Sequence, residues 1–442
     1  MNFDQALGYL LSLGHETLTI KLGLANTEAL LHALDNPHQH FPKVQIAGTN
    51  GKGSVAVILD SICRAAGIRV GLFTSPHLVL ITERISINGE HTSEGDFARF
   101  TEHVKTTAEV LVEQGQLKAR PTFFEHVTAI ALLAFREAKV ELAILETGLG
   151  GRLDSTTAAA AAVVAITQVA MDHEEYLGHG LAEIATEKAA IIRPGVTAII
   201  APQQETVLRV IIDRCKEVGV EPRLVKSENH ARSRNAPASV DGRCVITLPT
   251  EHEEFAKVRL GLRGRHQIVN ALTAVALAEA LGERGFRITR ETIIKGVESA
   301  RHPGRLEIWE HEPQILLDGA HNPAAARALR DYLDEFAKAP ITMIFGAMRD
   351  KALGKIAALL FTPADELILT SMDNPRAANM ETLMAAVPQG FDMTRTHEAA
   401  SPSSALQLAR ELTPASGLIC VTGSLYLVGA VREVLSSEER SG

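Results

Sequence analysis

The chain has 442 residues, of which 46% are hydrophobic and 22% charged, and its formal net charge is −9. This length predicts two domains, and the acidic balance argues against a general nucleic-acid or membrane-surface binder. Four scattered cysteines, no membrane-length apolar run, and a start without the features of a signal peptide predict a cytoplasmic protein with reduced thiols.

The first predicted strand leads into a glycine-rich loop, and a helical pattern follows. The loop over 47–54 reads Ala-Gly-Thr-Asn-Gly-Lys-Gly-Ser. Glycines let backbone N–H groups approach phosphate oxygens, and the following helix directs its positive end at them. Lys52 would supply a mobile charge, and Ser54 a hydroxyl for Mg²⁺ or phosphate. The usual pattern G-x-x-x-x-G-K-[ST] is broken at Ile46 and Gly53, so a tight turn without a nucleotide is the alternative.

Strand and helix patterns alternate along the first 300 residues. Continuous β-branched runs between helices predict a parallel sheet that is covered on both faces. The predicted strands are 44–46, 69–73, 140–145, 163–166 and 196–200, and the predicted helices are 55–66, 125–138, 181–192 and 268–281.

The alternating pattern restarts late in the chain. Short apolar strands are predicted at 315–317, 341–345, 367–369 and 418–421. The Pro- and Gly-containing segment 301–305 is a plausible junction. We therefore expect an α/β protein in which residues 1–300 form a P-loop ATPase-like parallel-sheet domain. Residues 301–442 are expected to form a smaller Rossmann-like α/β domain.

Polar side chains follow several predicted strands, where ligands bind in open parallel sheets. Ser75 lies in a Thr-Ser-Pro-His run that could equally be a turn. Glu146 ends a buried strand, and its carboxylate needs either a metal ion or Arg152 as a partner. His173 follows the next strand and is a competent metal ligand, although a lone histidine is more often structural.

Three other polar positions each have a simpler alternative. Lys188 follows Glu187 in a predicted helix, which fits an exposed acid–base pair. Asn270 opens an apolar helix, where it could cap the helix or contact a ligand. Asp318 follows the first strand of the second domain, which fits a simple Asx turn.

Together these segments resemble the Mur ligase superfamily and, within it, the folylpolyglutamate synthase/dihydrofolate synthase family. They stand in family order from residue 22 to beyond 350, and the family shares the unusual phosphate loop. The motifs that carry the resemblance are 47–54, 74–78, 83–85, 122–125, 148–154, 172–173, 187–189, 266–267, 303–305 and 317–323.

The resemblance implies an ATP-dependent ligase that adds L-glutamate to dihydropteroate, to folates, or to both. ATP would phosphorylate a carboxylate of the pteridine substrate, and the amino group of glutamate would attack the acyl phosphate. Such a site must neutralise charge during phosphoryl transfer and exclude water from the activated acyl group. ATP and Mg²⁺ are the expected cofactors, and small molecules are the expected partners of a monomer.

The resemblance also implies roles for single residues. Catalytic roles fall to Lys52, Lys188 and His173, with Lys188 carbamylated so that it becomes a metal-binding anion. The implied Mg²⁺ ligands are Ser75, Glu146 and His173. The implied ATP contacts are Asn50, Gly51, Lys52, Gly53, Ser54, Asn270, Arg305 and Asp318. The implied pterin-binding residues are Thr122, Phe123, Phe124, Glu125, Leu153 and Asp154, although either phenylalanine could instead pack in the core.

This chain departs from the family pattern after Asp154. The family usually continues with a small residue, Thr and Asn, whereas here Ser155, Thr156 and Thr157 follow, so an amide is lost. The segment 18–24 could help to form a pteroate site. The alternatives to a bifunctional ligase are a single-function folylpolyglutamate synthase, another superfamily ligase that acts on a cell-wall precursor, and a non-enzymatic ATP-binding module.

Overall fold

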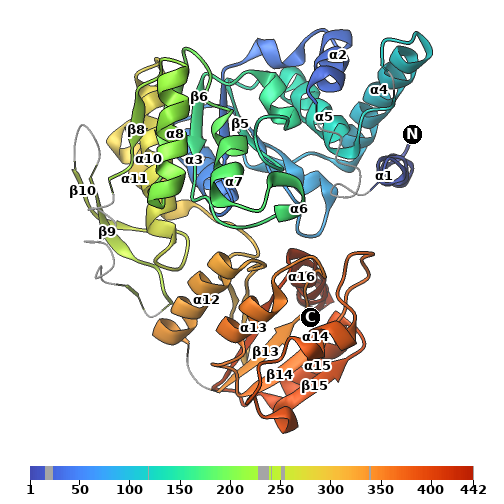
Figure 1. The fold of residues 1–442 in the computed structure, drawn as a ribbon, viewed down its shortest axis with the longest axis vertical. Helices are drawn as coiled ribbons and strands as arrows, with labels where there is room; N and C mark the ends of the chain where they lie inside the picture. The colour runs from blue at the N-terminus through green and yellow to red at the C-terminus, as the bar shows by residue number, and fades with distance from the viewer. Residues whose placement is uncertain are drawn as a thin grey trace. The chain divides into compact units, whose positions relative to one another are not determined.

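A computed structural model describes residues 1–14, 23–117, 119–226, 238–239, 241–249, 254–337 and 340–441. The chain forms two compact units, which Figure 1 shows as ribbons. The first unit comprises residues 1–230, 248–258 and 269–300, and the second comprises 231–247, 259–268 and 301–442. Residues 18–22, most of the segment 18–24 that was considered for a pteroate site, lie outside the described residues. The assignment of separate functions to 1–300 and 301–442 stays a prediction.

The first unit is built on an eight-stranded sheet with the order β4-β3-β2-β5-β1-β6-β7-β8. Six of these strands run parallel, and β3 and β4 add an antiparallel edge. The strands are β1 (Lys43–Ala47), β2 (Val70–Phe73), β3 (Ile85–Ile87), β4 (Glu90–His91), β5 (Leu142–Glu146), β6 (Val163–Ile166), β7 (Thr197–Ile200) and β8 (Pro222–Leu224). All five apolar runs predicted as strands in this part of the chain are strands.

Helices cover this sheet because its central strands are apolar on both faces. The helices are α1 (Phe3–Ser12), α2 (Ala25–Ala33), α3 (Lys52–Ala65), α4 (Glu94–Glu113), α5 (Phe123–Glu137), α6 (Glu174–Leu177), α7 (Leu181–Ala189), α8 (Glu205–Glu217), α10 (Gln267–Gly282) and α11 (Arg290–Ser299). Helix α3 packs on β1, β2 and β5 and is covered in turn by α11. Gly296 permits that close approach, because a Cβ there would lie 2.5 Å from the backbone nitrogen of Ile62.

The second unit contains a six-stranded sheet with the order β11-β12-β16-β13-β14-β15, in which β11 is antiparallel to its neighbour. The strands are β11 (Glu307–Trp309), β12 (Gln314–Leu317), β13 (Ile341–Phe345), β14 (Glu366–Thr370), β15 (Thr396–Ala399) and β16 (Leu418–Thr422). The helices are α12 (Pro323–Phe336), α13 (Leu353–Leu360), α14 (Met380–Ala385), α15 (Pro402–Leu412) and α16 (Leu425–Ser441). A separate pair, β9 (Val245–Pro249) and β10 (Glu254–Arg259), forms a small two-stranded sheet. The predicted α/β architecture with two sheet domains is confirmed.

The strand order of the first sheet places a ligand site at a definite edge. After β1 the chain builds β2 and β5 on one side of it and β6 to β8 on the other. In open parallel sheets such a reversal leaves a crevice at the carboxyl ends of the strands, and ligands bind there. The predicted phosphate loop leaves β1 at this edge.

All four cysteines are buried free thiols, with Cys63 and Cys215 in the first unit and Cys244 and Cys420 in the second. Burial raises the pKa of each thiol. They pack as small apolar side chains. None of the helices in the described part of the chain combines the length and apolarity needed to cross a membrane.

Candidate active site

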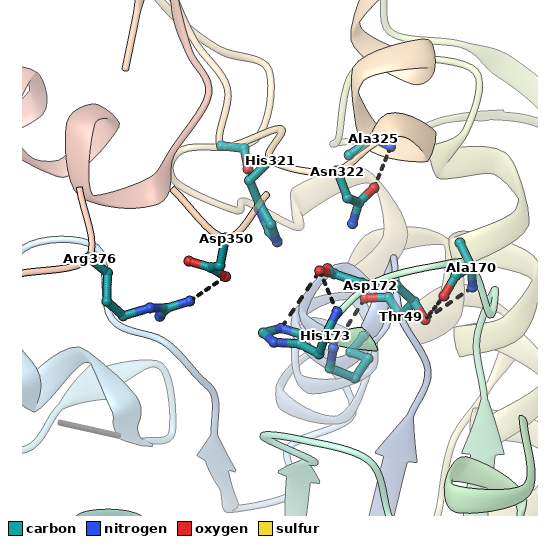
Figure 2. A network of polar contacts seen from close by, with 11 residues as sticks. Thr49, Ala170, Asp172, His173, His321, Asn322, Ala325, Asp350 and Arg376 are labelled. Atoms are coloured by element: carbon teal, nitrogen blue, oxygen red, sulfur yellow. Dashed lines mark hydrogen bonds and ion pairs between the residues drawn. The ribbon is translucent and has the colours of Figure 1, made fainter. Parts of the chain in front are cut away.

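The loop after β1 is anchored to the segment that follows β6. The backbone N–H groups of Thr49 and Asn50 both donate to the carbonyl of Gln168, at 2.9 and 3.1 Å. The Thr49 hydroxyl donates to the carbonyl of Ala170 at 3.0 Å and accepts from the Ala170 N–H at 3.1 Å (Figure 2). Because these two N–H groups are used within the protein, a phosphate would be met at the start of α3, where a helix presents backbone N–H groups and the positive end of its dipole.

Two glycines of this loop have no room for a side chain. Gly48 has φ +149°, and a Cβ there would overlap the side chain of Thr167. Gly51 has φ +89°, and a Cβ there would overlap the side chain of Asn270. Asn270, which is 9% exposed, therefore lies directly against the start of α3. The structure brings this predicted ATP contact to the predicted phosphate loop.

The Lys52 side chain folds back over the loop and donates to the carbonyl of Thr49 at 3.2 Å. This bond holds the ammonium group beside the first turn of α3, where Ser54 is buried at 4% exposure. A lysine at such a helix start adds a full charge to the partial charge of the helix terminus. The arrangement suits an anionic ligand.

Lys188 is buried, so the interpretation as an exposed acid–base pair is wrong. Only 4% of the residue is exposed. Burial first and the positive charge of Lys52 second lower the pKa of Lys188 to about 7, while Asp172 and Asp154 oppose the shift. Lys188 therefore lies among the charged groups of the phosphate-loop edge and is readily found as a neutral amine at physiological pH.

Because residue 151 is a glycine, α7 can approach the glycine-rich loop closely enough to place Lys188 at the phosphate-loop edge. A Cβ on Gly151 would lie 2.8 Å from the carbonyl oxygen of Glu187 and 3.1 Å from that of Lys188. The backbone N–H of Arg152 donates to the same Glu187 carbonyl at 2.9 Å. Arg152 was considered as the alternative partner of Glu146. In the structure its side chain forms an ion pair with Glu187 at 2.9 Å.

Two of the predicted metal ligands are adjacent at the ends of β2 and β5. Glu146 is 5% exposed, and its Oε2 accepts from the backbone N–H of Ser75 at 3.1 Å. The third, His173, has φ 51°, and its Nε2 lies 4.0 Å from Asp172 Oδ1, which also accepts from the His173 backbone N–H (Figure 2). Carboxylate and hydroxyl oxygens are the ligands that Mg²⁺ prefers.

No group of three or more His, Cys, Asp and Glu side chains arranged to hold a metal occurs among the described residues. Mg²⁺ in phosphoryl-transfer sites usually takes one or two carboxylates and completes its shell with water and phosphate oxygens. Glu146 and Ser75 therefore fit such an ion, and their role as ligands stays a prediction.

The predicted pterin segment opens α5 with a capping box. The Thr122 N–H donates to Glu125 Oε2 at 2.7 Å, and the Glu125 N–H donates to Thr122 Oγ1 at 3.3 Å. Phe123 is 4% exposed and belongs to the core. Phe124 is only partly buried, and a Cβ on Gly148 would lie 2.5 Å from its ring. Of the two rings, Phe124 is the one that borders the glycine-rich loop.

Asp154 closes the glycine-rich loop rather than projecting freely from it. Its carboxylate accepts the N–H groups of Leu149 at 2.9 Å and Thr156 at 3.0 Å. Burial raises the pKa of Asp154, and the hydrogen bonds from Thr156 and Leu149 counteract this rise. Asp154 also caps the short 3₁₀ helix η3 (Ser155–Ala159), so the three residues after it are part of a regular turn. Leu153 beside it is partly buried.

In the second unit, two predicted ATP contacts lie together at the carboxyl end of β12: Asp318 follows the strand, and Arg305 reaches it from the segment before β11. Asp318 accepts the N–H groups of Leu306 at 2.9 Å and Ala320 at 3.0 Å, so the expected Asx turn is present. Burial raises the pKa of Asp318, and the charge of Arg305 lowers it. Arg305 Nη1 donates to the carbonyl of Gly319 at 3.1 Å. A nucleotide contact by either residue stays a prediction.

The loops around this turn carry further polar side chains, which Figure 2 labels. Asn322 caps α12 by accepting the N–H of Ala325 at 2.9 Å. Arg376 pairs with Asp350 at 2.7 Å. This ion pair was not expected from the sequence, because its partners are far apart in the chain and stand in no recognisable motif.

The full burial of two polar side chains of the first unit was not predicted from the sequence. Gln45 is 0% exposed in the middle of β1, and Arg84 is 1% exposed and donates to His77 Nδ1 at 2.8 Å. A polar residue inside an apolar run just before the phosphate loop is a signal that could have identified Gln45, because buried amides need partners.

Comparison with known protein families and relatives gives a consistent answer. Residues 46–278 match the Mur ligase middle domain, and residues 304–425 match the glutamate ligase domain of Mur ligases. The dihydrofolate synthase/folylpolyglutamate synthase of Bacillus subtilis is 33% identical over 94% of this chain and 95% of its own length. A probable bifunctional folylpolyglutamate synthase/dihydropteroate synthase of Halobacterium salinarum is 35% identical over 98% of this chain. The chain spans about half (51%) of that relative's length.

Solved structures agree with these relatives. Mycobacterium tuberculosis folylpolyglutamate synthase complexed with ADP has a TM-score of 0.89 at 30% identity, covering 98% of both chains. Escherichia coli FolC in complex with DHPP and ADP has a TM-score of 0.84 at 30% identity, covering 99% of both. The Yersinia pestis bifunctional enzyme complexed with AMPPNP and Mn ion has a TM-score of 0.82 at 28% identity, covering 99% of this chain and 98% of that one.

Proposed function

Because the chain belongs to the folylpolyglutamate synthase/dihydrofolate synthase family of Mur ligases, we propose that it joins L-glutamate to dihydropteroate and to folates at the expense of ATP. The observation that carries the proposal is the buried Lys188 beside Lys52 at the edge where the phosphate loop leaves the sheet. Relatives bound to ADP, DHPP and a manganese ion with AMPPNP support the same substrate classes.

The phosphate loop would hold ATP for transfer of its terminal phosphoryl group to the pteridine carboxylate. Lys52 and the first turn of α3 would counter the charge that develops on the transferred group. A divalent ion, when held by Glu146 and Ser75, would neutralise further phosphate charge. The amino group of glutamate would then displace phosphate from the acyl phosphate. Asn270, Arg305 and Asp318 complete the proposed set of ATP contacts.

Lys188 has the chemistry that carbamylation requires. A neutral amine attacks CO₂ and releases a proton, which leaves a carbamate anion on the side chain. With a pKa of about 7, roughly half of the Lys188 amines are neutral at pH 7, whereas an ordinary lysine is almost wholly charged. The carbamate would turn a repulsive cation beside Lys52 into an anion that could bind metal, together with His173.

The pteridine ring is assigned to the edge formed by Phe124 and the glycine-rich loop. Phe124 offers a partly exposed ring there, and Asp154 fixes the loop that borders it. Phe123 contributes from the core by supporting α5. The proposed enzyme is a cytoplasmic monomer, in keeping with its four buried free thiols, and sedimentation of the purified protein tests the oligomeric state.

The direct test of the proposal is ADP release by the purified protein with Mg²⁺, ATP and glutamate. Dihydropteroate and tetrahydrofolate are supplied in separate reactions, and the glutamylated products are identified by mass. Products with both substrates establish the bifunctional enzyme, and a product with one assigns a single activity. If neither substrate gave ADP or a glutamylated product while ATP still bound, the proposed substrates would be excluded. Another acyl substrate or a non-catalytic ATP-binding module would then be favoured.

Glu146→Gln is expected to raise the Mg²⁺ concentration needed for half-maximal activity by about tenfold or more, since an amide is a poorer ligand for this ion than a carboxylate. The amide can be accommodated without large change in volume. Activity is measured across a Mg²⁺ titration at saturating ATP. Glu141→Gln, a carboxylate on the exposed end preceding β5, is the matched control. An unchanged metal requirement in Glu146→Gln would remove that carboxylate from the metal site.

A further inference from the structure

A buried hydroxyl network joins β1 to the glycine-rich loop, and the proposed reaction gives it no role. Gln45 sits in register between Leu145 of β5 and Val164 of β6 and is 0% exposed. Its Nε2 lies 2.7 Å from Thr157 Oγ1 and 3.0 Å from Thr156 Oγ1, with a longer contact of 3.3 Å to Thr147 Oγ1, just before the glycine-rich loop. These bonds satisfy the amide NH₂, which would be unfavourable in a buried strand without them, whereas Gln45 Oε1 has no hydrogen-bond partner among the described residues.

The directions of the other bonds determine which end of the Gln45 amide faces the threonines. Thr156 Oγ1 donates its proton to Asp154 Oδ1 at 2.5 Å, and Thr157 Oγ1 donates its proton to the carbonyl of Gly151 at 2.7 Å. Each hydroxyl has one proton, so both present only lone pairs to Gln45. The amide NH₂, with two protons, satisfies both at once, and a side chain without donors would satisfy neither.

The two hydroxyls extend this support to opposite parts of the loop. Through Thr156 it reaches Asp154, whose other oxygen holds the N–H of Leu149 at 2.9 Å. Through Thr157 it reaches Gly151, which packs on the backbone of α7 at Lys188. Gln45 is therefore connected to Asp154, which fixes the loop proposed to border the pteridine, and to the helix end that carries the buried lysine.

We propose that Gln45 is a positioning residue that holds the glycine-rich loop 148–154 in its binding geometry for the pteridine substrate. At position 157 the family usually has asparagine, whereas this chain has threonine. Gln45 of β1 supplies an amide to this position from the opposite side. The inference rests on the proposed function, which assigns the pteridine to this loop. The bonds run to the loop and not to the phosphate loop, so the affinity for ADP is expected to be independent of Gln45.

The test compares Gln45→Leu, which is similar in size but has no donor, with the double variant Gln45→Ser/Thr157→Asn, which returns an amide from position 157. In Gln45→Leu, amide hydrogen exchange of 148–157 should become about tenfold faster in the substrate-free protein, and exchange of 48–54 should not change. The KM for dihydropteroate should rise about tenfold with a smaller change in kcat, and the Kd for ADP should stay within about twofold. The double variant should recover much of both losses.

A control separates positioning from general loss of stability. Thr342→Val removes a buried hydroxyl that bonds Thr413 at 2.6 Å in the second unit, and it should leave exchange of 148–157 unchanged. Wild-type exchange and KM in Gln45→Leu would overturn the proposal, as would an equal loss of ADP affinity or no recovery in the double variant. Because exchange is measured without substrates, a wild-type protein inactive with both pteridines would count against the proposed function alone.

Discussion

Replacing Lys52 with alanine is expected to lower kcat by about 10²–10⁴-fold while the protein remains folded. The side chain makes one hydrogen bond within its own loop, at 3.2 Å to the carbonyl of Thr49, so its loss removes little packing. The ammonium group lies beside the loop proposed to bind the phosphates, and such charges act mainly on the transition state of phosphoryl transfer. Steady-state ADP release at saturating ATP and Mg²⁺ measures the effect.

The matched control for this change is Lys216→Ala. Lys216 lies on α8 of the same unit, 74% of its side chain is exposed, and it pairs only loosely with Asp213 at 3.6 Å. Both variants should melt near the wild-type temperature, and Lys216→Ala should keep wild-type turnover. If Lys52→Ala also kept near-normal kcat, the loop would not be the phosphate site.

Lys188→Met is expected to lower kcat by about 10²–10⁴-fold and, at the same time, to stabilise the fold. The folded-state pKa of Lys188 is lowered from 10.5 to about 7, so between these values the unfolded chain binds more protons than the folded chain. Wild-type stability therefore rises with pH across this window, and the cost of burying the charge is fully present below pH 7. The gain from methionine should be largest near or below pH 7 and fade towards pH 10.5. Urea unfolding in bicarbonate-free buffer measures it.

Carbamylation of Lys188 is tested separately with ¹³C-labelled bicarbonate. The wild-type protein should show a carbamate carbon signal near neutral pH that weakens as pH falls below 7, since protonation removes the reactive amine. Lys188→Met should lack this signal, and Lys216→Met, at an exposed position on α8, should retain it. A wild-type protein without the signal, but with full activity in CO₂-free buffer, would leave Lys188 as an uncarbamylated amine.

Hydrophobic patterning was enough to locate the central strands of both sheets. Runs such as 163–166 and 341–345 are buried on both faces, and every side chain in them except Thr342 is apolar, so the pattern is clear. The edge strands β4 and β15 were not predicted, because their side chains are not uniformly apolar. β15 is Thr-His-Glu-Ala and mostly half-exposed, and β4 has only two residues, so pairing with a neighbour and not composition makes them strands.

Residues at strand ends could be proposed from sequence because the topology of a parallel sheet gathers those ends at one edge. The neighbouring positions of Ser75 and Glu146 agree with this reasoning. The burial of Lys188 could not be read in the same way, because it depends on a glycine 37 positions earlier that lets α7 approach. The partners of Gln45 could not be predicted either, since Thr156 and Thr157 come from another part of the chain.

The placement of the cysteines offers a way to observe each unit opening on its own. Each unit holds two thiols that are shielded from solvent, and the raised pKa values keep them protonated. An alkylating reagent should therefore modify Cys63 or Cys215 only while the first unit is open, and Cys244 or Cys420 only while the second is open. Peptide mapping of the labelled protein would then give two opening rates from one sample. A bound nucleotide or pteridine should slow labelling of the unit that it contacts, so the same cysteines could reveal which substrate is held by which half of the enzyme.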